Sequence, residues 1–284
     1  MWVSNYCSEN SYLNAQNHER YKKIFYEEIA ALKEFIKTQT VTSPDYLSDK
    51  HGIAFAYNQK EHMNDETIVI PNNIGIYQLG NMRTPSLFSE CKKCKKVIIE
   101  RGVGKISNYT FSCMPMLETI SLPTSIVYIG EGAFRSCFNL KKFDFPRQIH
   151  VIYPNTFADC YNLEKVTLPP FLVSILPNAF ENCQSLRTID IPESTQLIGE
   201  SAFQGCSDLR EVIIRGFNTK LQGDNIFNIR NNNEVMIVCQ AGSQAEKYAI
   251  EHNLSFRHIG KQYSSKLNYE KHRKPDMRMY VGDF

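Results

Sequence analysis

The sequence predicts an α/β repeat solenoid, a right-handed coil that forms one parallel β-sheet from 23-residue units and carries helical caps at both ends. Three observations predict this fold. Phenylalanine recurs at a constant interval of 23 residues from Phe88 to Phe203, and Phe227 follows one residue late. Cysteine and leucine recur at the same interval, and each unit contains a short apolar alternation. Repeats of about 20 to 50 residues are typical of solenoids and related arrays.

Equivalent positions of the units keep their residue type over more than one hundred residues. Isoleucine stands five residues before each column phenylalanine from Phe111 to Phe203, and an apolar residue, mostly leucine, stands six residues after the column phenylalanines. The residues three positions after the phenylalanines are Cys91, Met114, Cys137, Cys160, Cys183 and Cys206. Methionine replaces cysteine without breaking the column, so we interpret the cysteines as small apolar core residues. A disulfide ladder or a stack of metal ligands is the alternative interpretation.

Each unit is expected to contain one short strand. The pattern after the column leucine alternates between apolar and other residues, as in Leu140, Phe143 and Phe145, and this period of two is typical of a strand with one apolar face. Proline follows at Pro146 and at the equivalent positions, and it ends the strand because it cannot donate to a β-ladder. The rest of a 23-residue coil is too short for a long helix, so we expect a short helical or 3₁₀ turn around the sequence Ala-Phe-x-x-Cys.

The two ends of the chain depart from the repeat and are interpreted as caps and a tail. An apolar stripe at helical spacing runs through Tyr21, Phe25, Ile29, Leu32 and Ile36. A helix here would cover the first coil, and a partner-binding helix is the alternative. We expect a helical N-terminal capping region at 1–64, the solenoid at 65–239, a C-terminal capping helix and strand at 240–259, and a basic flexible tail at 260–284.

The composition argues against several classes of protein. The 32 basic and 30 acidic residues give a net charge of +2, which does not suit a general nucleic-acid surface. No apolar run is long enough to span a membrane, and the chain starts without the basic and apolar regions of a signal peptide. The pair Cys91 and Cys94 is the one CxxC motif, and it lacks a partner motif for zinc. The sequence therefore predicts no enzyme, no metal site and no cofactor.

The repeat resembles the BspA-type leucine-rich repeat, whose units read Ile-x-x-x-Ala-Phe-x-x-Cys-x-x-Leu-x-x-h-x-h-Pro, where h is apolar. The segments that carry the resemblance are IGEGAFRSCFNLKKFDFP and IGESAFQGCSDLREVII, and the resemblance extends over about residues 68–259. It includes a closing strand and helix in VMIVCQAGSQAEKYAIEHNLSFRHI. The resemblance implies a leucine-rich-repeat coil. The family is known from bacterial surface proteins and protozoan parasites, and it is associated with adhesion to host matrix proteins and to other cells.

The outward positions of the predicted strands form one continuous face of mixed charged and hydroxyl side chains. Solenoids use such faces to bind extended partners, and a merely solvated sheet face is the alternative. The candidate binding residues on this face are Lys96, Ser121, Lys142, Asp144, Lys165, Thr167, Arg187, Asp190 and Arg210.

The predicted function is a non-enzymatic protein-binding module of the adhesion or host-interaction type, and its partner would be a protein such as a host or matrix protein. An intracellular scaffold protein is the first alternative, and an activity carried by residues 1–64 is the second. The family resemblance implies the cell surface or secretion. The missing signal peptide leaves a cytoplasmic location open.

Overall fold

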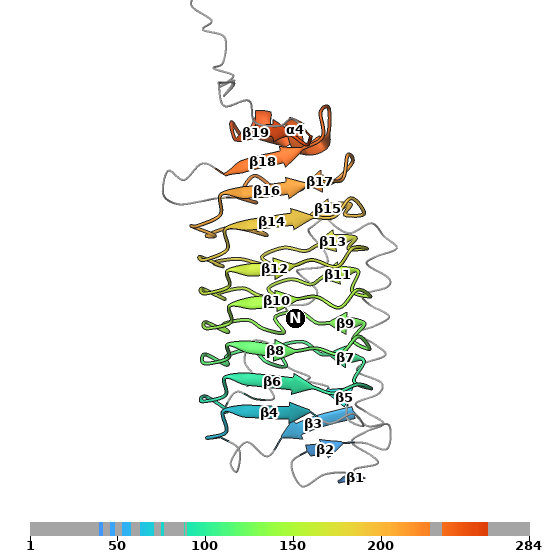
Figure 1. The fold of residues 1–284 in the computed structure, drawn as a ribbon, viewed down its shortest axis with the longest axis vertical. Helices are drawn as coiled ribbons and strands as arrows, with labels where there is room; N and C mark the ends of the chain where they lie inside the picture. The colour runs from blue at the N-terminus through green and yellow to red at the C-terminus, as the bar shows by residue number, and fades with distance from the viewer. Residues whose placement is uncertain are drawn as a thin grey trace, which may run out of the picture.

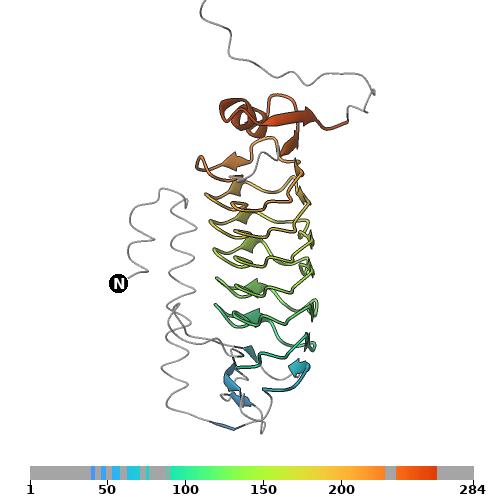
Figure 2. The same ribbon diagram turned by 90° about the vertical axis from the view of Figure 1, so that its left-hand side faces the viewer.

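The structure is a computed structural model that describes residues 40–41, 46–48, 53–57, 63–70, 75–76, 88, 90–227 and 235–260. The strands before residue 63 and the strand at 75–76 are described by their backbone alone. The predicted apolar stripe of residues 21–36 and the tail from residue 261 lie outside the described residues. The described coils stack along one almost straight axis, as Figure 1 shows from the front and Figure 2 from the side.

One short strand per coil forms the main ladder, as the sequence predicted. Its strands are β4 (Thr67–Ile70), β6 (Lys96–Ile99), β8 (Thr119–Ser121), β10 (Lys142–Asp144), β12 (Lys165–Thr167), β14 (Thr188–Ile191), β16 (Glu211–Ile214), β18 (Met236–Cys239) and β19 (Ser255–His258). They pair in parallel within three segments, ordered β4-β6-β8, β10-β12 and β14-β16-β18-β19, which follow one another along the axis (Figure 1). Phe143 pairs with Val166 and both are buried, whereas the residues on either side of them are exposed.

The prediction of a single sheet was wrong, because the isoleucine column forms a second parallel ladder. Its strands are β5 (Gly75–Ile76), β7 (Lys105–Ile106), β9 (Tyr128–Ile129), β11 (Val151–Ile152), β13 (Ser174–Ile175), β15 (Leu197–Ile198) and β17 (Lys220–Leu221). Each of these strands has two residues, which is too short to show an alternation in the sequence. The buried, β-branched isoleucines favour the extended backbone nonetheless.

Strands also occur within the region for which the sequence predicted a helical cap. β3 (Ile53–Tyr57) pairs in parallel with β5 and so extends the second ladder toward the N-terminus. β2 (Tyr46–Ser48) and β1 (Thr40–Val41) continue this sheet in antiparallel order. The sequence predicted a helical capping region here and gave no indication of these strands.

The segment around each column phenylalanine is a turn with its own hydrogen-bond ladder. The N–H of Cys137 donates to the carbonyl of Phe134, which closes a 3₁₀-type turn as expected. The N–H groups of Phe134 and Ser136 instead donate to Thr156 and Ala158 of the following coil. Every second peptide of the turn therefore points its N–H toward the next coil and its carbonyl toward the preceding one.

This turn requires two residues with a left-handed backbone in each coil. The first column holds Tyr109, Gly132, Asn155, Asn178 and Ser201, and the second holds Cys113, Ser136, Asp159, Asn182 and Gly205, with φ between 55° and 75° throughout. The left-handed region is unfavourable for most side chains, and glycine, asparagine and aspartate tolerate it best. The use of small polar residues at these columns follows from this constraint.

The core is a continuous stack of seven phenylalanine rings. Neighbouring ring centroids from Phe88 to Phe227 are 5.1 to 5.7 Å apart, and the ring planes differ by 12° or less. The additional residue before Phe227 leaves its ring in the column, 5.7 Å from that of Phe203. The C-terminal helix α4 (Gln244–Glu251) lies where the sequence predicted a helix, and its Tyr248 meets Phe227 edge-on at 6.1 Å. Tyr248 therefore ends the aromatic column.

Candidate protein-binding face

The structure places all nine candidate residues on the outer face of the main ladder or next to its strands, and all nine are exposed. Lys142 is the register partner of Lys165, and Asp144 is the register partner of Thr167. Ser121 is in β8 and Asp190 is in β14, on the same face. The parallel register, with a constant offset of 23 residues, makes each candidate a member of a row that runs along the solenoid axis.

Several charges on this face are already used in ion pairs between coils. Asp190 accepts two hydrogen bonds of 2.7 Å from Arg215, one from Nε and one from Nη2. This bidentate contact with Asp190 raises the pKa of the Arg215 guanidinium. The carboxylate of Asp190, one of the candidate binding residues, is therefore already engaged by Arg215. The signal for this pair was present, because arginine stands at position 215, where four preceding coils have proline.

Further ion pairs occur at each of the two ends of the face. Lys95 Nζ lies 2.7 Å from Glu66 Oε1, and Arg257 Nη2 lies 2.6 Å from Glu211 Oε1. Exposed pairs of this kind contribute about 0 to 1 kcal/mol each. Their main effect is to neutralise these four charges.

The centre of the face keeps two neighbouring lysines without an acidic partner. Lys142 and Lys165 are directly opposite each other in β10 and β12, and no carboxylate of the described residues lies within ion-pair distance of either ammonium group. Exposed hydroxyl side chains of Thr167 and Thr188 lie in the same or the next strand. Like charges directly opposite each other destabilise a sheet, so this pair is a feature that folding alone does not favour.

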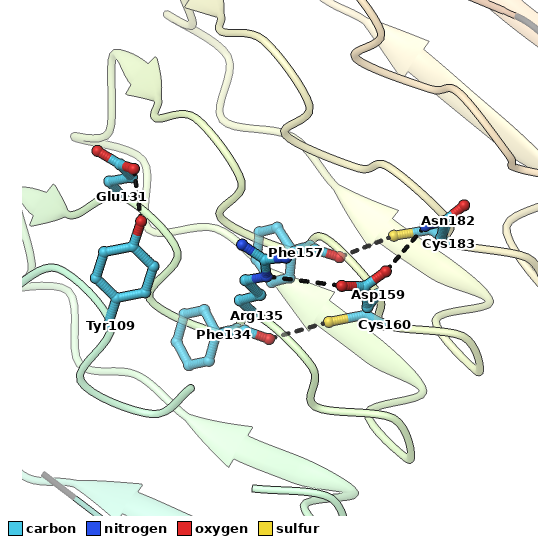
Figure 3. A network of polar contacts seen from close by, with 9 residues as sticks. All are labelled: Tyr109, Glu131, Phe134, Arg135, Phe157, Asp159, Cys160, Asn182 and Cys183. Carbon is cyan, nitrogen blue, oxygen red and sulfur yellow. Dashed lines mark hydrogen bonds and ion pairs between the residues drawn. The ribbon is translucent and has the colours of Figure 1, made fainter. Parts of the chain in front are cut away.

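The column cysteines have buried thiols that donate hydrogen bonds to backbone carbonyls of the preceding coil. Cys160 Sγ donates to the carbonyl of Phe134 at 3.1 Å, and Cys183 Sγ donates to that of Phe157 at 3.2 Å (Figure 3). Burial raises the pKa of the Cys206 thiol to about 12 and the pKa of the Cys160 thiol well above its usual value. These thiols are therefore protonated core groups. The eight described cysteines are free, Cys7 lies outside the described part, and no cluster of three metal-ligating side chains occurs among the described residues.

A polar network accompanies the turns on the side of the left-handed columns (Figure 3). The Tyr109 hydroxyl donates to Glu131 Oε1 at 2.6 Å, and burial raises the pKa of the half-buried Glu131 carboxyl. Asp159 accepts a hydrogen bond of 2.9 Å from Asn182 Nδ2 and lies 3.6 Å from Arg135 Nε. The network links consecutive coils. Sequence reasoning missed it because its members differ from coil to coil.

Exposed apolar side chains border the main ladder, and the sequence analysis did not identify them as a feature. Phe138 and Tyr161 stack on the surface with ring centroids 5.1 Å apart and planes within 6°. Met116 lies in the preceding coil, at the position equivalent to Asn139, and is 38% exposed. The sequence did contain a signal for them. These bulky residues stand between the cysteine column and the leucine column, at positions whose side chains are not expected to point into the core.

The comparisons with known proteins agree with the repeat. The chain matches the family described as BspA type leucine rich repeat region, with six copies over residues 54–183 and 151–266. Curated proteins gave no match. No helix in the described part of the chain has the length and apolar character needed to cross a bilayer.

Several solved structures are similar. A leucine-rich cell surface protein from Faecalibacterium prausnitzii is 24% identical over 62% of this chain and 45% of its own, with a TM-score of 0.49. A leucine-rich repeat protein from Bacteroides ovatus is 22% identical over 77% of this chain and 67% of its own, with a TM-score of 0.44. The leucine-rich repeat protein of T. pallidum is 19% identical over 78% and 94%, with a TM-score of 0.44. This chain thus spans less than half the length of the first of these structures. The profile match covers more than half of the chain, and the chain belongs to the BspA-type leucine-rich repeat family.

Proposed function

We propose that this chain is a non-enzymatic protein-binding module of the adhesion or host-interaction type, which holds a protein partner, such as a host or matrix protein, against the outer face of the main ladder. The observation that carries the proposal is the pair Lys142 and Lys165, two exposed like charges held in register without an acidic partner among the described residues. The family's association with adhesion supports the proposed class of function.

The regular packing beneath the face supports a partner that binds without rearranging the module. Backbone hydrogen bonds join neighbouring strands within each segment of the main ladder, and the phenylalanine stack packs the coils together beneath them. A preformed surface loses little conformational entropy on binding, which favours affinity. The nine exposed candidate residues can then act as one recognition surface in which only side chains adjust.

The test compares proteins captured by the wild type, by the double variant Lys142→Glu/Arg187→Glu, and by the control Lys105→Glu/Lys220→Glu. The control reverses two exposed lysines of the second ladder, which lie away from the outer face of the main ladder. We expect a protein from a cell-surface extract to bind the wild type and the control equally, and to bind the face variant about tenfold or more weakly. Equal capture by all three forms, with unchanged melting temperatures, would contradict the use of this face.

A further inference from the structure

A line of exposed apolar residues runs along three consecutive coils beside the proposed face. We call Met116, Phe138 and Tyr161 the aromatic ridge. Their side chains are 38%, 37% and 37% exposed, respectively. Single exposed apolar residues are normal on a protein surface, but contiguous ones mark interaction sites. Phe138 and Tyr161 are in contact across two coils, and Met116 lies in the preceding coil, one position nearer to its strand.

Hydrogen bonds hold this ridge in place. Asn162 Nδ2 donates to Asn139 Oδ1 at 3.1 Å, and Asn139 Nδ2 lies 3.6 Å from Met116 Sδ, so an amide ladder accompanies the ridge. The backbone N–H of Asn162 also donates to the carbonyl of Phe138 at 3.1 Å. The ridge is therefore a preorganised surface, and binding to it would not require the ordering of loose side chains.

The ridge borders the lysine pair. Met116, Phe138 and Tyr161 precede β8, β10 and β12 by three or four residues, so the ridge follows the edge at which these strands begin. Lys142 and Lys165 are the first residues of β10 and β12. The apolar line and the unpaired positive charges thus run side by side across the same coils.

We infer that the partner presents an acidic polypeptide segment with apolar or aromatic anchor residues, which lies along the solenoid axis with its carboxylates on Lys142 and Lys165 and its anchors on the aromatic ridge. This inference rests on the proposed function and names the chemistry of its partner. Charge complementarity selects the carboxylates, because the two ammonium groups have no acidic partner among the described residues. The dimensions agree, since strands about 4.8 Å apart let a short extended segment reach three coils.

The stacking geometry favours a polypeptide over a sugar chain. The rings of Phe138 and Tyr161 stack face to face. The surface along the side of the stack is therefore formed by ring edges. Sugar rings and nucleobases bind aromatic faces, whereas apolar side chains pack against ring edges and the thioether of Met116 equally well.

The test uses the full chain and a display library of short random peptides as the probe. Selected peptides are labelled, and their dissociation constants are measured for the wild type, for Lys142→Glu/Lys165→Glu and for Phe138→Ser/Tyr161→Ser. The controls are Lys105→Glu/Lys220→Glu and Phe171→Ser, which removes an aromatic side chain that is 58% exposed elsewhere. Melting curves confirm folding, and Lys142→Gln/Lys165→Gln replaces the charge reversal if that variant fails to fold.

We expect selected peptides to be enriched in both acidic and apolar residues, and each site variant to weaken their binding about tenfold or more while the controls leave it unchanged. The inference would be overturned by selected peptides whose affinity depends on the lysines but that lack acidic residues. It would also be overturned by peptides whose affinity is unchanged in Phe138→Ser/Tyr161→Ser. Either result would leave the proposed face intact. A heparin-derived sulfated oligosaccharide that binds the lysines more tightly than every peptide would also overturn it. If no selected peptide depends on either site, the inference and the proposed function both fail.

Discussion

Cys160 donates a hydrogen bond from its thiol to the backbone carbonyl of Phe134, 26 residues earlier in the chain and 3.1 Å away. Cys137, Cys183 and Cys206 make the same contact with the phenylalanines of their preceding coils. Each contact joins the two most regular columns of the repeat, and at Phe134, Phe157 and Phe180 it adds a second donor to a carbonyl that already accepts a backbone N–H. The recurrence of cysteine thus has a specific physical reason, because an aliphatic side chain of similar size could fill the space but could not donate.

Replacing one of these thiols should therefore destabilise the solenoid. We expect Cys160→Ala to lower the free energy of unfolding by about 1–3 kcal/mol, because the core loses the volume of the sulfur and the carbonyl of Phe134 keeps only the N–H of Cys137 as a donor. Cys113→Ala is the matched control, since Cys113 is the exposed cysteine of the described part of the chain. Denaturant unfolding measures both changes. Equal stability of the two variants would show that the thiol contact contributes nothing.

The same burial should protect the column thiols from alkylation. Burial raises the pKa of Cys206 to about 12 and raises that of Cys183 well above its usual value, so the reactive thiolate is scarce at neutral pH. We expect iodoacetamide to label Cys113 in the native protein and to label Cys160, Cys183 and Cys206 only after unfolding. Mass-spectrometric mapping of the labelled peptides checks this. Native labelling of Cys183 at the rate of Cys113 would be incompatible with the described packing.

The phenylalanine stack should carry much of the stability of the central coils. Phe157 is fully buried between Phe134 and Phe180, at centroid distances of 5.4 Å on both sides. Phe157→Ala should cost about 3–5 kcal/mol because it leaves a cavity in the stack. Phe171→Ala, at a site that is 58% exposed, should change stability by about 0.5 kcal/mol or less. A small effect at Phe157, measured by thermal unfolding, would mean that the stack is not the main source of cohesion.

Glu131 should make stability depend on pH. Burial is the main cause of the raised pKa of its carboxyl, although hydrogen bonds from Tyr109 and Asn155 act in the opposite direction. A folded pKa above the unfolded value means that its contribution is fully present below the ordinary glutamate pKa and is lost as pH rises through the folded pKa. Glu131→Gln should therefore match the wild type at acidic pH and exceed its melting temperature at neutral pH. The exposed Glu164→Gln is the control, and a parallel pH profile for wild type and Glu131→Gln would refute this account.

The repeat made most of the fold predictable, because a column residue such as Phe134 has the same inward position in every coil. The exposure of Lys142 and Asp144 followed from the same argument. The second ladder was missed because two residues such as Val151 and Ile152 are too few to show a period. The pairing of Asp190 with Arg215 was missed because a long side chain can reach across coils, and sequence spacing fixes a direction but not a partner.

The aromatic ridge was missed for a different reason. Phe138 and Tyr161 belong to no conserved column of this chain, since glutamine and serine follow at the equivalent positions. Repeat analysis emphasises what recurs, and a binding surface is built from what varies between coils. The ridge therefore lies outside the pattern that established the fold.

The hydrogen bonds between the turns all have the same direction along the solenoid axis. The N–H groups of Phe134 and Ser136 donate to the following coil, and the carbonyls of each turn accept from the preceding coil. Within the turns, the joint between two inner coils has N–H donors on the earlier coil and carbonyl acceptors on the later one. Whole 23-residue modules could thus be gained or lost in evolution without changing the chemistry of the joint, so the length of the recognition surface can vary independently of the two ends that close it.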